Sequence, residues 1–209
     1  MGSFSVKKHQ KALLSVLDEE YADYVEHPRY GHKPRFTGLN PRAVAESKVF
    51  IHWHSPKECR IANTAVAADL SRQTPGFIPV SHYFDVRRKC VDCDQMFIFF
   101  AEEQKHWYEE LGFGLDSDCV RCVNCRKRQQ GIAIARERYE ELFHIHERSV
   151  EENLEMAACC LTLIESNTFS RARAQQVRSL FNRIRRQRSE DASRLLIDLT
   201  SRLHAIEKD

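Results

Sequence analysis

The sequence predicts an α+β protein that is mostly α, with a small four-cysteine module flanked by helices and a C-terminal antiparallel helical segment. Two C-x-x-C pairs enclose an aromatic, strand-like stretch near the middle of the 209 residues. Apolar residues recur at spacings of three and four over the last third of the chain, which contains no proline. Only 7 glycines and 6 prolines occur in the whole chain, which leaves little room for long linkers or many tight turns.

The composition limits the class of protein. With 42% hydrophobic and 30% charged residues, the chain has the composition of a globular protein, so wholesale disorder is excluded. The net charge of +2 by itself says nothing about nucleic acid. The longest mostly apolar run, Met156–Ile164, is too short to span a bilayer. Because the N-terminus also has no apolar signal segment, we expect a soluble cytoplasmic protein without membrane association.

The first 78 residues are expected to form an N-terminal helical and irregular region. Its elements are predicted from apolar periodicity and from a Ser-x-x-Glu capping box that begins at Ser55. Three prolines and two glycines predict a loop after the first helix. In chain order we expect a helix over residues 5–27, a loop over 28–41, a strand over 47–54 and a helix from 55 to about 70.

Residues 79–128 carry the strongest chemical signal. Cys90 and Cys93 form one C-x-x-C, and Cys122 and Cys125 form another. Cysteines in a chain without an export signal favour metal over disulfides. Both sulfurs of a C-x-x-C knuckle face one metal ion, and two knuckles give a tetrahedral four-thiolate zinc site. Such a closed site has no ligand position for water, so we expect one structural Zn²⁺ and a zinc-ribbon domain over this segment.

The interval between the two cysteine pairs is longer than the roughly 15–20 residues typical of such sites. A strand over 96–100 and a short helix over 102–111 account for the excess, and another strand, over 80–88, precedes the first pair. Aromatic side chains in the interval would form a core so small that zinc must supply part of its stability. The acidic pairs Glu102/Glu103 and Glu109/Glu110 are expected to be solvated.

Spacing alone does not decide which cysteines form the second pair, because Cys119/Cys122 has the same spacing as Cys122/Cys125. The residues of this segment also resemble a known family. C-x-x-C, FIFFAEEQKHWYEELGF and RCVNCRK together resemble the probable zinc-ribbon domain family of uncharacterised bacterial proteins, over roughly residues 60–128. The resemblance implies zinc binding and no reaction. Its Arg-Cys-x-x-Cys-Arg ending matches residues 121–126, which implies Cys122 and Cys125 as ligands in preference to Cys119.

The C-terminal segment, residues 129–209, is predicted to be helical. Apolar periodicity predicts one long helix over 127–165, whose weakest point is Gly131, and a second helix over 170–188. Ser189 is expected to cap a third helix. A helical period carried by three consecutive segments with short breaks predicts antiparallel packing.

A weaker hypothesis is a metalloenzyme with a second zinc at His52, His54 and Cys59. The two histidines would project from the same face of the predicted strand, although alternate histidines on a strand are more often solvated or packed. The sequence contains no G-x-S-x-G, no H-E-x-x-H and no Gly-rich phosphate loop. We therefore expect no enzymatic activity.

Residues 168–188 contain no acid and several arginines, which suit phosphate oxygens. A nucleic-acid-binding protein that uses this arginine-rich helix is therefore an alternative function. The competing interpretation is internal neutralisation by glutamates of the preceding helix. The arginines are Arg171, Arg173, Arg178, Arg183, Arg185, Arg186 and Arg188, and the glutamates are Glu140, Glu141, Glu147, Glu151, Glu152 and Glu155. The leading hypothesis is a structural zinc protein that serves as an interaction module for an unknown protein partner or nucleic acid.

Overall fold

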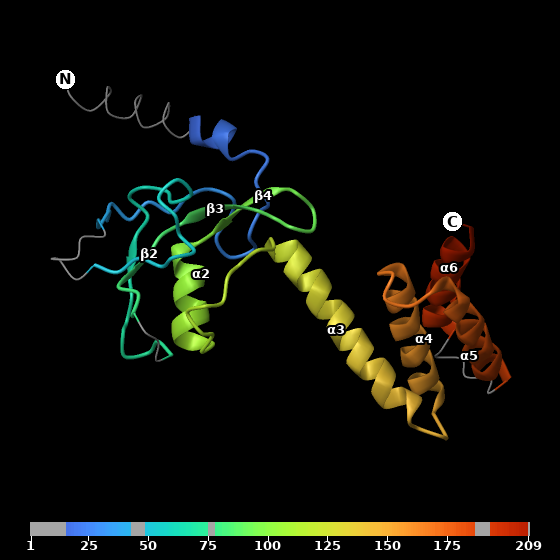
Figure 1. The fold of residues 1–209 in the computed structure, drawn as a ribbon. Helices are drawn as coiled ribbons and strands as arrows, with labels where there is room; N and C mark the ends of the chain where they lie inside the picture. The colour runs from blue at the N-terminus through green and yellow to red at the C-terminus, as the bar shows by residue number, and fades with distance from the viewer. Residues whose placement is uncertain (1–15, 43–48, 75–77, 187–192, 209) are drawn as a thin grey trace. The chain divides into compact units, whose positions relative to one another are not determined.

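The structure, a computed structural model, describes residues 16–42, 49–74, 78–186 and 193–208 (Figure 1). The chain forms two compact units, residues 1–126 and 127–209, and each is described here by itself. Among the described residues, the first unit contains four short strands and short helical segments, and longer helices make up the second, which confirms an α+β protein that is mostly α. The three-segment division at residues 78 and 128 stays a prediction.

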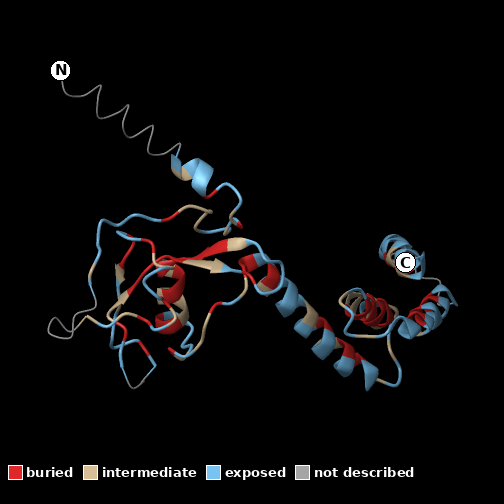
Figure 2. Ribbon diagram, turned by 45° about the horizontal axis from the view of Figure 1, so that its top comes forward, coloured by how far each residue is buried: buried red, intermediate tan, exposed pale blue. Residues whose placement is uncertain are grey.

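A β-hairpin lies at the centre of the first unit. Strands β3, Val86–Lys89, and β4, Met96–Phe99, pair antiparallel, with Val86 opposite Phe99 and Lys89 opposite Met96. Helix α2, Ala101–Lys105, follows β4 directly and continues as one π-helical turn, η2, His106–Glu110. The predicted strand over 96–100 and helix over 102–111 are therefore confirmed. Figure 2 shows buried residues concentrated in β4, α2 and the first turn of the next helix.

The segment from residue 47 to 70 differs from its prediction. The expected helix from Ser55 to about 70 is wrong, because the described residues form turns and the two-residue strand β1, Val66–Ala67. Backbone bonds to the hairpin strand replace helical bonds: the Ile61 N–H donates to the Asp85 carbonyl at 2.9 Å, and the Arg87 N–H donates to the Cys59 carbonyl at 2.8 Å. Tertiary pairing thus outweighs the local capping pattern.

The other N-terminal predictions hold in part. In the expected strand over 47–54, only Ile51 makes a bridge, to His82, among the described residues, and residues 43–48 lie outside them. The expected strand over 80–88 divides into β2, His82–Tyr83, which pairs with β1, and β3. Residues 16–20 of the expected first helix are helical, turns follow, and residues 1–15 lie outside the described part.

Two buried polar side chains organise the junction between the hairpin and α2. The Asp85 carboxylate accepts the backbone N–H of Arg35 at 2.8 Å and that of Ala101, the first residue of α2, at 2.7 Å. Burial raises the pKa of Asp85 to about 6, although both N–H donors favour its charged form. Gln104 donates to the carbonyls of Phe84 and Phe99 at 2.6 and 2.9 Å. Sequence periodicity does not reveal either contact.

The second unit contains most of α3, Val123–Phe143, together with α4, Val150–Glu165, α5, Ala174–Arg186, and α6, Ser193–Lys208. A 3-10 turn, η3, Arg171–Arg173, precedes α5. The long helix expected over 127–165 breaks at residues 144–149, not at Gly131, which lies inside α3. Ser149 caps α4 in a capping box with Glu152.

Ion pairs reveal the relative directions of the helices in the second unit. Arg178, early in α5, pairs with Glu207, late in α6, so these two helices run antiparallel. Arg202 of α6 pairs with Glu165 at the end of α4, so α4 and α6 run in the same direction and α4 is antiparallel to α5. The predicted antiparallel helical segment is confirmed.

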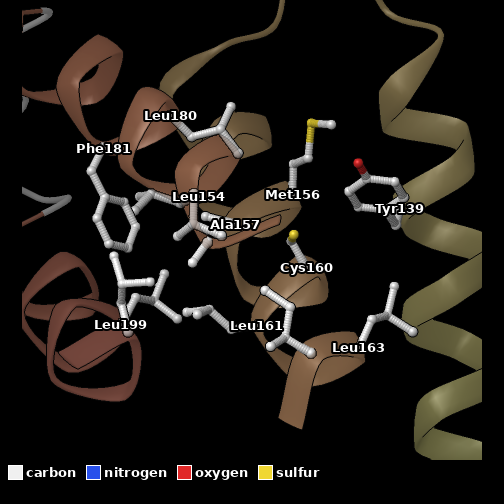
Figure 3. Close-up of a cluster of buried hydrophobic side chains, with 14 of the residues drawn as sticks. Tyr139, Leu154, Met156, Ala157, Cys160, Leu161, Leu163, Leu180, Phe181 and Leu199 are labelled. Atoms are coloured by element: carbon white, nitrogen blue, oxygen red, sulfur yellow. The ribbon is translucent and has the colours of Figure 1, made fainter. Parts of the chain in front are cut away.

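Buried apolar side chains from all four helices form the core of this unit (Figure 3). Cys160 is fully buried in it, as its position on the apolar face of α4 predicts. The side chains labelled in the figure are Tyr139, Leu154, Met156, Ala157, Cys160, Leu161, Leu163, Leu180, Phe181 and Leu199. Among the described helices of both units, none is long and apolar enough to cross a membrane.

Candidate metal centre

The first cysteine pair lies in the turn of the β3–β4 hairpin. Cys90 follows the last residue of β3, and its backbone N–H donates to the carbonyl of Gln95 at 2.9 Å. The chain reverses at Asp94, which has a positive φ of 60° and whose N–H returns to the Cys90 carbonyl at 3.0 Å. This tight turn brings Cys90 and Cys93 to the same end of the hairpin. Cys90 is buried, and Cys93 is exposed.

The second pair comes from the start of α3. Cys122 immediately precedes the helix and Cys125 lies in its first turn, where the Arg126 N–H donates to the Cys122 carbonyl at 2.9 Å. Both sulfurs are buried. Backbone N–H groups in the first turn of a helix have no helical acceptor, so this position favours negatively charged thiolates.

The four sulfurs form one compact group. All four Sγ atoms of Cys90, Cys93, Cys122 and Cys125 lie within 4.8 Å of one another. The Sγ atoms of Cys93 and Cys122 are 3.8 Å apart. A tetrahedral site with metal–sulfur distances of about 2.3 Å has sulfur–sulfur edges of about 3.8 Å. The described residues therefore provide four thiolate donors at the spacing that a tetrahedral metal ion requires.

The electrostatics of the group also favour a cation. Burial raises the pKa of the Cys90 thiol, but hydrogen bonds from backbone N–H groups, first that of Cys122, outweigh burial and lower it to about 6. Burial and the neighbouring cysteines raise the pKa of Cys125 to about 12. Four adjacent thiols cannot all ionise without a positive charge between them, and a metal ion supplies that charge.

Cys119 lies outside this group. Its side chain is 1% exposed, and its Sγ donates to the Arg121 carbonyl at 3.4 Å. Burial raises the pKa of Cys119 to about 12. The structure thus brings Cys122 and Cys125, and not Cys119, together with the hairpin pair.

Charged residues around the cysteines hold the two ligand segments together. Arg121, which precedes Cys122, donates from Nε to both carboxylate oxygens of Asp92 in the hairpin turn at 3.0 Å. Arg126, which follows Cys125, pairs with Glu103 of α2 at 2.6 Å and lies 4.9 Å from the ring centroid of Trp107. Sequence spacing did not identify these partners, because they lie on other elements.

The expectation that the acidic pairs are solvated is wrong for one member of each. Glu103 is 5% exposed and Glu109 is 6% exposed. Glu103 faces Arg126 and His27, and Glu109 accepts the Asp69 N–H at 2.8 Å and lies 3.6 Å from the Lys105 ammonium. Adjacent residues on α2 and η2 do diverge, as expected, and one member of each pair therefore turns inward.

The second metal site expected from His52, His54 and Cys59 is not formed by the described residues. The His52 Nε2 donates to the Leu115 carbonyl at 2.6 Å, and its Nδ1 accepts the His54 N–H at 3.1 Å, so neither ring nitrogen is available to a metal. The ring stacks on Tyr108 with 5.2 Å between centroids. Burial lowers the pKa of His52 to about 4. Within the described residues, the four cysteines are the one group of three or more metal-binding side chains.

A comparison with known protein families supports the predicted domain around the four cysteines. Residues 84–133 match a family model described as a probable treble clef domain. The matched segment includes β3, β4, α2, η2, all four cysteines and the start of α3. This match confirms the zinc-finger-like domain that the resemblance indicated. No curated protein and no solved structure matches the chain.

Proposed function

We propose that the protein is a structural zinc protein in which Cys90, Cys93, Cys122 and Cys125 bind one Zn²⁺. The observation that carries this proposal is the convergence of four sulfurs from two segments of the chain within 4.8 Å. Soft thiolate ligands in a tetrahedral set favour zinc over harder divalent ions. When bound, zinc supplies a closed cross-link and leaves no ligand position for a substrate or water.

A cross-link of this kind would stabilise the first unit. Its described strands are two to four residues long, and its buried apolar side chains divide into three small clusters. Clusters of this size stabilise a fold weakly. Zinc bound at both ends of the segment from Cys90 to Cys125 would fix the hairpin to the first turn of α3 and contribute its binding free energy to folding.

Metal content of purified variants tests the zinc site. We expect one equivalent of zinc per chain in the wild type and a loss of most of it in Cys90→Ser and Cys125→Ser. Cys119→Ser keeps its zinc, and Cys159→Ser, a half-buried cysteine of the helical unit, is the matched control. Full zinc in both ligand variants would refute the site. Two equivalents in the wild type would show a second metal site outside the four cysteines.

We further propose that the protein acts by binding a partner, and one observation favours nucleic acid. Arg183, Arg185 and Arg186 are exposed on α5, which contains no acid, and none of the three has an ion pair among the described residues. Three of the six glutamates expected to neutralise them pair with other arginines: Glu140 with Arg136, and Glu141 and Glu155 with Arg138. Exposed guanidinium groups that have no ion pair among the described residues suit phosphate oxygens. Arg178 differs, because it pairs with Glu207.

Fluorescence anisotropy with labelled single- and double-stranded oligonucleotides tests this second proposal. We expect affinity that falls steeply between two salt concentrations, as counterion release requires. Arg185→Glu should weaken binding, and Arg194→Glu, which makes the same charge change at an exposed position of α6, is the matched control. Absence of binding even at low salt would refute a nucleic-acid partner and leave a protein partner as the interaction to seek.

A further inference from the structure

A cavity of about 640 Å³ lies in the first unit, away from the four cysteines. Two loops and the residue after β2 line it, with Asn40, Pro41, Arg42, Lys57, Arg60, Ala62 and Phe84. Its volume falls in the range of about 300–1,000 Å³ typical of small-molecule sites. Neither the proposed zinc site nor the arginines of α5 contribute to it.

Three cations line this cavity, and none of its described lining residues is acidic. Arg42, Lys57 and Arg60 have no ion pair within the described part of the chain. Five other arginines of the same unit have acidic partners, whereas Arg29 and Arg72 have none among the described residues. The pairs are Arg35 with Glu102, Arg87 with Glu20, Arg88 with Asp118, Arg121 with Asp92 and Arg126 with Glu103. Like charges that share a cavity repel one another, and a bound anion removes that cost.

Arg60 is fixed in the wall of this cavity. The backbone of Arg60 is held by a bridge to Val86, and its guanidinium carbon lies 5.5 Å from the ring centroid of Phe84. The side chain is therefore held in the cavity wall before any ligand arrives.

We propose that this cavity binds a small phosphorylated molecule. A phosphate monoester carries a charge of about −1.5 to −2 and three strong acceptor oxygens, which match three cations better than a single carboxylate does. The planar guanidinium of Arg60 would bind two phosphate oxygens, and the positive charges of Lys57 and Arg42 would balance the remaining negative charge of the phosphate. Pro41, Ala62 and Phe84 provide an apolar wall for the rest of the molecule.

Isothermal titration of the zinc-loaded full chain tests the proposal with two matched pairs of probes. The pairs are adenosine 5′-monophosphate with adenosine, and ribose 5-phosphate with ribose. We expect saturable binding of a phosphorylated probe at one equivalent per chain and none of its phosphate-free partner. Arg60→Gln and Lys57→Gln should each weaken it about tenfold, which corresponds to the loss of one charge-assisted hydrogen bond. Arg72→Gln, an exposed arginine of the same unit that does not line the cavity, should leave it unchanged.

Lys57 is exposed, so its variant keeps the test valid if Arg60→Gln fails to fold. Failure of both phosphorylated probes to bind would overturn the proposal, and so would equal affinity for each phosphate-free partner or full affinity in Lys57→Gln. Vesicles of phosphatidylcholine with and without a phosphatidylinositol phosphate identify the source of the phosphate. Vesicle binding that is lost in Lys57→Gln would assign a lipid headgroup, and probe binding without vesicle binding would assign a soluble metabolite.

Discussion

His52 is buried in its neutral form, and this should make the first unit sensitive to acid. The pKa of His52 in the folded protein is about 4, against 6.5 for an ordinary histidine, because burial disfavours the imidazolium. Above pH 6.5 the ring is neutral in both the folded and the unfolded chain, and its contribution to stability is fully present. As the pH falls from 6.5 through 4, the unfolded chain binds a proton that the folded chain does not, and stability is lost.

The two pKa values set the size of this effect. Linkage gives a loss of about 2 kcal/mol by pH 5 and about 3 kcal/mol by pH 4. His52→Gln removes the titrating group and keeps an N–H donor toward the Leu115 carbonyl. It should cost about 1–2 kcal/mol at pH 7.5, because the acceptor for the His54 N–H is lost. The difference between wild type and variant should then shrink or reverse by pH 5.

Urea unfolding followed by tryptophan fluorescence measures this difference, because both tryptophans of the chain, Trp53 and Trp107, lie in the first unit. Comparing wild type with variant at each pH cancels contributions that they share, including protonation of the cysteine thiolates. His144→Gln, at an exposed position in the helical unit, is the control. Equal slopes of unfolding free energy against pH for wild type and His52→Gln would refute the argument.

Three further predictions concern the two cores and the metal. Gln104→Met removes the side-chain donor to the buried carbonyls of Phe84 and Phe99 and should cost about 1–3 kcal/mol in urea unfolding; a cost below 0.5 kcal/mol would contradict this. Leu161→Ala empties a fully buried position of the helical unit and should cost about 2–5 kcal/mol by circular dichroism, whereas Leu195→Ala, 47% exposed, should cost under about 0.5 kcal/mol. A chelator should lower the unfolding midpoint seen by tryptophan fluorescence more than that seen by far-ultraviolet circular dichroism, because most helical residues lie in the second unit; equal shifts would argue against a metal in the first.

Local patterns in the sequence determined much of the central domain and of the helical unit. The C-x-x-C spacing, the aromatic run at residues 96–99 and the helix that follows were all predictable, because each depends on neighbours a few residues away. The apolar stripes of α5 and α6 were predictable for the same reason. The break at residues 144–149 also had a local signal, the Ser149-x-x-Glu152 capping box, which the sequence interpretation missed.

The same capping pattern shows why local signals are insufficient. Ser149 and Glu152 begin a helix whose apolar stripe packs into the core of the helical unit, so capping and burial favour the same structure. Ser55 and Glu58 have an identical spacing. The residues after them nevertheless form no helix, and the Ile61 backbone N–H donates a hydrogen bond to the Asp85 carbonyl, just before the hairpin. A cap contributes about 1 kcal/mol, which long-range pairing and burial readily exceed.

Tertiary structure alone decided the composition of the candidate sites. Spacing could not separate Cys119 from Cys125, because both lie three residues from Cys122. The start of α3 turns Cys125 toward the hairpin pair, while Cys119, which is buried in the same apolar cluster, is not part of the group of four sulfurs. The burial of His52 and the cations around the 640 Å³ cavity come from segments far apart in the chain. The sequence by itself determined which residues have metal-binding or charged chemistry. Only the folded chain decided which of them meet, because burial and charge pairing depend on residues that the sequence order does not place together.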